Sequence, residues 1–181
     1  FAPFIYIKKE IKEVSVSAGA RYDTRSFKNN SLYTTTNPNT GFNMSTADTT
    51  GAKKLFDNYK HTFNGFSGSV GLTYNITNQF LIKANVARGY RAPNISEISA
   101  KGVHPGTGFQ QLGDANFKPE FNTQEDLGIF FDSQHLSISA EVFNNKIDNY
   151  IFNQKLQSQI GGDSIYIEAG NNYPVYKFRQ T

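Results

Sequence analysis

Apolar and polar residues alternate with a period of two along several stretches of this chain. The alternation is cleanest over residues 14–22, where Val, Ala and Tyr are interleaved with Ser, Gly and Arg, and it recurs over residues 66–76, 80–90 and 136–142. Because successive side chains of a strand point to opposite faces, this pattern predicts strands with one apolar and one polar face. Further strands are expected over residues 2–8, 123–131 and 164–178, which makes about seven in all.

The connections between these stretches alternate in length. Tight turns are expected at residues 8–11, 77–79 and 132–135, and long polar segments at residues 26–62, 92–122 and 148–163. In an antiparallel up-and-down meander, alternate connections lie at the same end of the sheet, so the short turns share one rim and the long loops the other. Transmembrane β-barrels have this asymmetry, and their strands need only about 9–11 residues each. The sequence therefore predicts an all-β fold that forms part of a transmembrane β-barrel.

The composition excludes several kinds of site. The chain has no Cys, which rules out disulfides, thiolate metal sites and a Cys nucleophile. Its net charge is +3, but the basic residues are scattered, whereas a nucleic-acid surface needs them clustered. His61, His104 and His135 are dispersed, and no base and nucleophile are paired in a recognisable motif. We therefore expect no enzyme activity, no metal site, no cofactor and no nucleic-acid partner.

A segment that a generic β-domain does not require lies at residues 87–120, which read ARGYRAPNISEISAKGVHPGTGFQQLGDANFKPE. It resembles TonB-dependent outer-membrane receptors. In that family a barrel strand ends in Gly-Tyr/Phe-Arg-Ala-Pro, an external loop follows, and Gly-(Asp/Asn)-x-(Asn/Asp)-Leu-Lys-Pro-Glu leads into the next strand. The corresponding elements here are residues 89–93, 96–98 and 113–120, with Phe117 where the family more often has Leu.

The resemblance implies active uptake of a scarce nutrient, most often an iron chelate or siderophore, haem or another metal complex. It places the protein in the outer membrane of a bacterial cell, in contact with lipid. Family members also carry a plug domain, through which they engage the energy-coupling TonB protein. Residues 1–181 are therefore expected to be a partial β-barrel segment of a larger receptor, with the plug domain absent.

Two groups of residues in the motif segment are candidates for separate roles. Haem-importing members carry a histidine between the two conserved elements, and His104 occupies that interval. The expected ligand-contacting residues are His104, Arg91, Tyr90 and Phe109. Arg88 and Arg91 are expected to clamp carboxylates such as Glu97 or Glu120. The residues expected to shape the loop are Arg88, Pro93, Glu97, Asp114, Lys118, Pro119 and Glu120.

Three further interpretations stay open at this level. Arg88 or Arg91 could face an anionic ligand instead of a carboxylate. The chain could also be a soluble β-sandwich that binds glycans or a protein, with Tyr33, Phe42 and Phe109 as stacking platforms, or a segment of a passive porin. In the barrel interpretation the polar strand residues predicted to face the lumen are Arg21, Lys83, Asn85 and Glu141.

Overall fold

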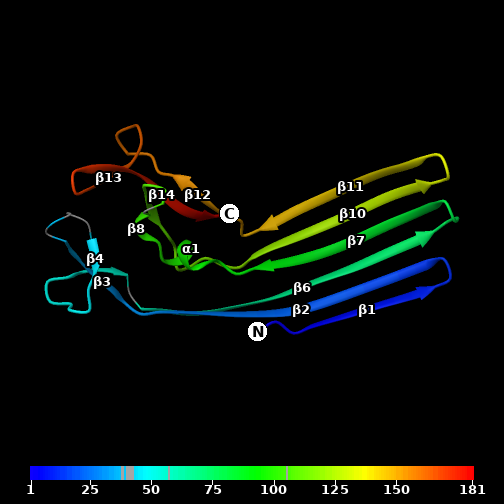
Figure 1. Cartoon of the computed structure of the whole chain (residues 1–181), viewed down its shortest axis with the longest axis horizontal. Coiled ribbons are helices and arrows are strands. Elements are labelled where there is room, and N and C mark those ends of the chain that lie inside the picture. Colours follow the sequence, from blue (N-terminus) through cyan, green and yellow to red (C-terminus); the bar gives the residue numbers. More distant parts are fainter. Residues whose placement is uncertain (38, 40–42, 57, 105) are drawn as a thin grey trace. The chain divides into compact units, whose positions relative to one another are not determined.

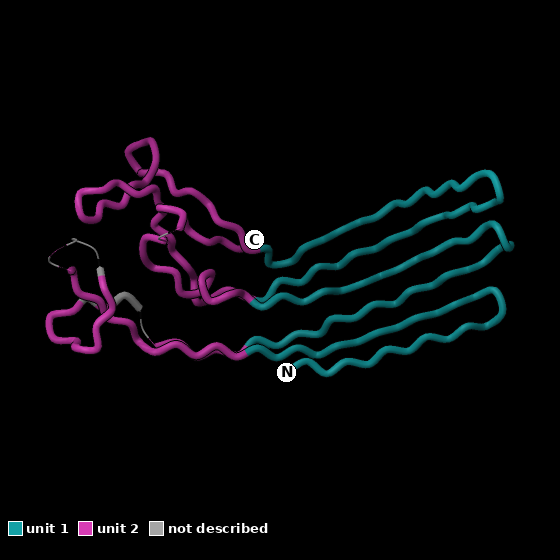
Figure 2. Tube along the Cα trace, viewed as in Figure 1, with its two compact units in different colours: residues 1–25, 63–92, 119–150 teal, residues 26–62, 93–118, 151–181 magenta. Residues whose placement is uncertain are grey.

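The computed structural model describes residues 1–37, 39, 43–56, 58–104 and 106–181, which form two compact units (Figure 2). Unit 1 comprises residues 1–25, 63–92 and 119–150, and unit 2 comprises residues 26–62, 93–118 and 151–181. The elements, in chain order, are β1 (Phe4–Ile11), β2 (Val14–Asn29), β3 (Leu32–Thr36), β4 (Asn43–Ser45), β5 (Lys53–Phe56), β6 (Tyr59–Asn75), β7 (Phe80–Arg91), α1 (Ile95–Ser99), β8 (Lys101–His104), β9 (Phe109–Leu112), β10 (Glu120–Asp132), β11 (Ser137–Asp148), β12 (Ile151–Lys155), β13 (Ile165–Glu168) and β14 (Asn171–Gln180).

Unit 1 is one six-stranded sheet in the order β1-β2-β6-β7-β10-β11. The hairpins β1–β2, β6–β7 and β10–β11 are antiparallel, and their tight turns lie at the same end of the sheet (Figure 1). The predicted all-β meander, with short turns on one rim, is confirmed. Because the described residues of unit 1 form a single sheet, they give no support to a sandwich of two facing sheets.

One predicted turn was misplaced. A tight turn was expected at residues 8–11, but they complete β1, and the turn lies at Lys12 and Glu13. The charges fit a strand because Lys8 and Glu10 point to the same face, where their side chains form an ion pair of 2.6 Å. The turns predicted at residues 77–79 and 132–135 agree with the structure to within a residue.

The strand register separates the sheet into an apolar and a polar face. Cross-strand partners share a face, and one such row joins Leu72, Ala84, Leu127 and Val142. The neighbouring row, on the opposite face, joins Thr73, Lys83, Gly128 and Glu141. Thus Lys83 and Glu141, two of the residues predicted to face a lumen, lie together on the polar side of the sheet.

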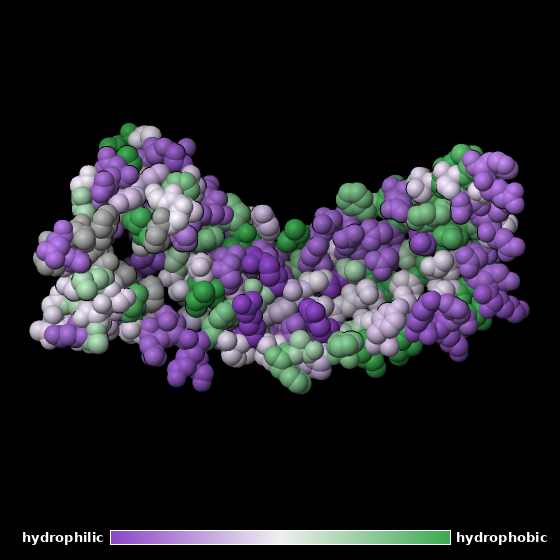
Figure 3. Space-filling view, viewed as in Figure 1, coloured by the Kyte–Doolittle hydropathy of each residue, from purple (hydrophilic) through white to green (hydrophobic). Residues whose placement is uncertain are grey.

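The apolar face of unit 1 is open rather than packed into a core. The view in Figure 3 shows hydrophilic and hydrophobic residues side by side on the surface of unit 1. Leu127 is 50% exposed and Val142 is 66% exposed, and all eight residues of β1 are exposed. The 12 residues of β7 extend about 40 Å, which corresponds to about 30 Å across a bilayer at a typical strand tilt. That length matches the hydrocarbon core of a membrane. No helix in the described part of the chain is long and apolar enough to cross a membrane.

Unit 2 holds short elements where long loops were expected. One sheet has the order β4-β3-β5, and a second has the order β12-β14-β9-β8, with β13 also paired to β14. Strands β9 and β14 are parallel. The single strand expected over residues 164–178 is instead the hairpin β13–β14, because Ala169 and Gly170 both adopt positive φ angles and make a two-residue turn.

A pair of arginine substitutions tests the assignment of the two faces. If the apolar face borders lipid, as the barrel interpretation predicts, Leu72→Arg should destabilise the lipid-reconstituted chain by about 2–4 kcal/mol, because it places a charge on that face. Thr73→Arg, one residue along on the polar face, should cost far less. Urea titration in lipid vesicles measures both effects, and equal losses of stability would contradict the assignment.

Candidate functional site

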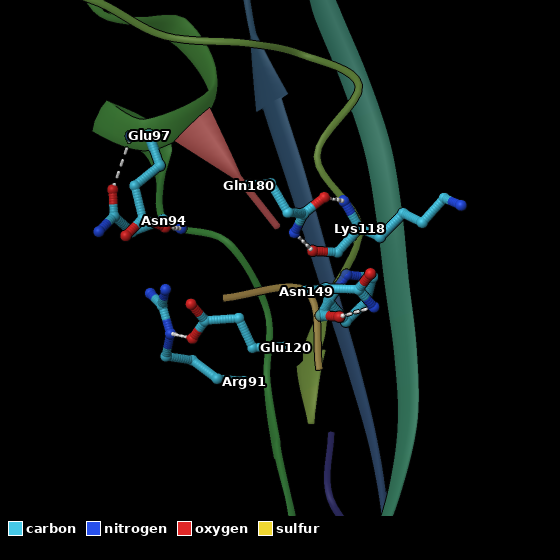
Figure 4. A network of polar contacts seen from close by, with 8 residues as sticks. Arg91, Asn94, Glu97, Lys118, Glu120, Asn149 and Gln180 are labelled. Carbon is cyan, nitrogen blue, oxygen red and sulfur yellow. Dashed lines mark hydrogen bonds and ion pairs between the residues drawn. The ribbon is translucent and has the colours of Figure 1, made fainter. Parts of the chain in front are cut away.

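The ends of β7 and β10 in unit 1 are joined by an ion pair. Arg91 and Glu120 are cross-strand partners, and the Nε of Arg91 donates to the Oε2 of Glu120 (Figure 4). The Glu120 residue is only 7% exposed, so its charge requires such a partner. Next to it in the chain, the carbonyl of Pro119 accepts a hydrogen bond of 3.1 Å from Asn149. These contacts fix the point at which the chain enters β10.

The segment after Pro93 forms the short helix α1 in unit 2. Asn94 caps the helix: its side chain accepts from the backbone N–H of Glu97, and the Glu97 carboxylate accepts from the backbone N–H of Asn94, both at 2.8 Å. This capping box satisfies backbone donors that the first helical turn leaves open. Pro93 is fully buried, and Ile98 is 4% exposed. The Asn-Ile-Ser-Glu sequence therefore folds as a rigid helical turn rather than a free loop.

The Gly113-Asp114 pair packs directly on the backbone of α1. The N–H of Gly113 donates to the carbonyl of Ala100 at 2.7 Å, and that of Asp114 to the carbonyl of Glu97 at 2.9 Å. A Cβ at Gly113 would lie 2.7 Å from the Glu97 carbonyl oxygen, closer than real Cβ contacts occur. Glycine is therefore needed here for close approach of two backbone segments.

The backbone of Lys118 is held by a distant residue that no sequence motif singles out. The side-chain amide of Gln180 in β14 accepts from the backbone N–H of Lys118 at 3.0 Å and donates to its carbonyl at 2.7 Å (Figure 4). The two residues are 62 positions apart, and a glutamine carries no local signal for such pairing. Together with the packing of Gly113, this contact shapes the segment that precedes β10.

Tyr90 and Arg88 in unit 1 both contact Phe121. The ring centroid of Phe121 lies 5.7 Å from that of Tyr90 and 4.2 Å from the guanidinium carbon of Arg88. Arg88 thus stacks on an aromatic ring, and no carboxylate in the described part of unit 1 pairs with it. The Tyr90 ring occupies the space above Gly65, and its hydroxyl is buried with no hydrogen-bond partner among the described residues.

His104 and Phe109 come together in unit 2, as cross-strand partners on the β8–β9 hairpin. The Nδ1 of His104 accepts a hydrogen bond of 3.2 Å from the backbone N–H of Gly106. The ring of Phe109 stacks on that of Tyr176 in β14, with centroids 4.6 Å apart and planes 25° apart. The register of β9 and β14 places Gln111 beside Tyr176 on the same face. The result is an imidazole next to a two-ring aromatic surface.

Lys155 adds a charge beside this surface, because it is the cross-strand partner of Tyr176. Its ammonium group donates to Asp163, and this hydrogen bond raises the pKa of Lys155. The pKa of Asp48, in the segment after β4, is lowered because the backbone N–H of Thr50 donates to its carboxylate. No three His, Asp or Glu side chains in the described ranges are grouped as a metal site would require.

The four expected ligand-contacting residues thus fall into two groups. Arg91 and Tyr90 belong to unit 1, where they contact Glu120 and Phe121. His104 and Phe109 belong to unit 2, where Tyr176 extends their surface. Of the stacking residues in the glycan-binding alternative, Tyr33 has the Lys54 ammonium 5.9 Å from its ring centroid, and Phe42 lies outside the described residues.

Comparison with known proteins gives a consistent family and fold. A family model described as "TonB dependent receptor-like, beta-barrel" matches residues 9–177. The search of curated protein sequences gave no match. Among solved structures, the copper transporter OprC is similar, with a TM-score of 0.63 at 17% identity. The haemophore receptor HasR of Serratia marcescens, solved with its haemophore HasA and haem, is similar with a TM-score of 0.64 at 14% identity.

The siderophore receptor PirA from Pseudomonas aeruginosa is also similar, with a TM-score of 0.51 at 13% identity. These alignments cover 97%, 99% and 97% of this chain for OprC, HasR and PirA. They cover only 24%, 29% and 36% of the respective receptors. At these identities the likeness is one of fold, and the chain spans about a third or less of each compared structure.

Replacing Gly113 tests whether the motif segment acts as architecture. We expect Gly113→Ala to destabilise α1 by about 1–3 kcal/mol, because the added methyl group meets the helix backbone. Hydrogen exchange of the amides of residues 97–100 should become faster. Gly102→Ala is the matched control, since its Cβ would meet nothing within 4 Å. Unchanged exchange in Gly113→Ala would contradict the packing role.

Proposed function

Because the chain belongs to the TonB-dependent receptor β-barrel family, we propose that it forms part of the barrel wall of an outer-membrane receptor for active nutrient uptake. Residues 1–181 supply a partial barrel segment of this receptor. The apolar face of unit 1 contacts membrane lipid, and its polar face borders the lumen. Energy for transport comes from the TonB protein, which acts through a plug region outside this segment. No catalytic role and no nucleic-acid partner are proposed.

The amphipathic sheet supports the membrane part of this proposal. A closed barrel satisfies every backbone hydrogen bond without water, so its outer surface can be apolar while its inner surface stays polar. The rows through Leu72 and Thr73 have this division. On the polar face, Asn85 donates to Asp126 at 3.2 Å, and Arg21 forms an ion pair with Asp23 at 2.8 Å. Polar and charged side chains on this face suit a water-filled lumen, whereas the opposite face suits lipid.

The ligand class that we propose is a metal complex: an iron chelate or siderophore, haem, or a related complex. The three compared receptors transport or bind copper, a haemophore with haem, and siderophores, as their names state. Metal complexes of this kind often carry aromatic or oxygen-rich groups around the metal. Aromatic rings and hydrogen-bond donors on the protein recognise such groups through stacking and charge-assisted hydrogen bonds.

The observation that carries the assignment of the binding surface is the stacked pair of Phe109 and Tyr176 beside His104. All three lie in unit 2, with His104 and Phe109 in the segment that connects β7 to β10, and connecting segments carry most binding sites on rigid scaffolds. His104 is exposed, so its imidazole can reach a ligand. Arg91 and Tyr90 shape the strand ends in this proposal, because they are held by Glu120 and Phe121.

Ligand binding in detergent tests this proposal. The chain has no Trp, so its intrinsic fluorescence comes from tyrosine, and metal complexes bound near Tyr176 should quench it. The probes are a ferric tris-catecholate, haemin and Cu²⁺. We expect one of them to bind, and His104→Ala and Phe109→Ala each to weaken that binding about tenfold.

His135→Ala is the control, since His135 lies in the β10–β11 turn, at the other end of the sheet from the long connections. Its affinity should equal that of the unmodified chain. Failure of all three probes to bind, or an equal loss in the His135 variant, would contradict the proposed site.

A further inference from the structure

Arg88 and Lys146 lie close together on the apolar face of unit 1, where charge is unexpected. The register joins Arg88 of β7, Thr123 of β10 and Lys146 of β11 in one row across three adjacent strands. Two residues along the strands, a row joins Val86, Glu125 and Asn144, and two residues further another joins Ala84, Leu127 and Val142. Because residues two apart along a strand share a face, the row of Arg88, Thr123 and Lys146 belongs to the apolar side of the sheet.

This cationic row lies where the apolar face ends. From the hairpin turns upward, the face carries the partners Phe80 and Phe131, then Ile82 and Ile129, then Ala84 and Leu127. Beyond Arg88 come Tyr90 and Phe121, an aromatic pair of the kind found at the boundary between lipid tails and headgroups. The row therefore sits at headgroup depth, on the rim away from the tight turns.

The side chains in this row have the chemistry that a phosphate group needs. The guanidinium of Arg88 rests on the Phe121 ring and, among the described residues, has no carboxylate partner. The Lys146 ammonium lies 3.0 Å from Asp148 and its side chain is 72% exposed. Strands two apart are separated by about 10 Å, a span that long arginine and lysine side chains can close from both sides. Thr123 places a hydroxyl between them.

Two carboxylates border the row. Glu125 lies one row nearer the apolar band and accepts a hydrogen bond of 3.4 Å from Asn144, and Asp148 lies one row further out, in contact with Lys146. The row itself carries only positive charge and a hydroxyl. Arginine binds phosphate oxygens through its planar fork, and lysine binds them as a point charge.

We propose that Arg88, Thr123 and Lys146 bind the phosphate group of a phosphorylated lipid in the membrane leaflet at this rim. The ligand is a phosphomonoester on a lipid headgroup, of the lipid A type, with its acyl chains against the apolar rows below. This inference rests on the proposed function, because it requires that the apolar face contacts lipid.

The test measures binding of diphosphoryl lipid A to the full chain in detergent micelles by native mass spectrometry. We expect the double variant Arg88→Gln/Lys146→Gln to bind about 30-fold more weakly, from about fivefold per lost cation at a membrane surface. Lys83→Gln is the matched control, because Lys83 lies on the same strand but on the opposite face. Its affinity for lipid A should be unchanged. Dephosphorylated lipid A should bind weakly and equally to all three proteins.

Several results would overturn the inference. If the double variant bound lipid A as tightly as the unmodified chain, Arg88 and Lys146 would not form the site. The same would follow if Lys83→Gln lost as much affinity as the double variant. Displacement of lipid A by a modest excess of inorganic phosphate would show that the row binds free phosphate instead of a lipid. Failure of the unmodified chain to enter vesicles of any composition, measured by protease protection, would contradict the membrane assignment itself and thus the proposed function as well.

Discussion

Antiparallel hydrogen bonding along six strands is the constraint on which the other features of the structure depend. Each strand of unit 1 is paired in register with its neighbours, and side chains alternate between faces at every residue. A slip of one residue would move Leu72 and its row to the polar side and bring Lys83 and Glu141 to the apolar side. The sheet can therefore border lipid on one face and water on the other only if its register keeps this alternation of faces.

The same pairing determines what the strand ends can do. Arg91 and Glu120 are partners in the last row of β7 and β10, so a charged contact forms where the ladder stops. In unit 2, the capping box of α1 and the close approach of Gly113 to the helix backbone restrict the conformations of this segment. These contacts must offset the conformational entropy that the segment loses. His104 and Phe109 are held as partners by β8 and β9. The proposed binding surface is accordingly built on short paired strands and not on a flexible loop.

The sequence predicted the parts of the fold that follow from local pattern. Period-two alternation located the strands of unit 1, and Asn, Ser and Asp located two of its turns, but the charged residues 8–11 were mistaken for a turn. Strands β3, β4, β5, β8, β9 and β12 were missed because stretches of three to five residues are too short to show clear alternation. His104 and Phe109 were selected from the motif, whereas Tyr176 and Gln180 contribute through contacts with residues more than 60 positions away, which no local pattern reveals.

Whether one face of the sheet borders lipid can be measured with nitroxide labels, because the chain has no cysteine of its own. Labels at Val16→Cys and Ser17→Cys, neighbours on β2, would be compared in lipid vesicles by their collisions with oxygen, which concentrates in lipid, and with a water-soluble nickel complex. If the face of Val16 borders lipid, oxygen accessibility will be high and nickel accessibility low at residue 16, with the reverse at residue 17. Equal accessibility at both positions, or nickel access at residue 16, would contradict this assignment of the face.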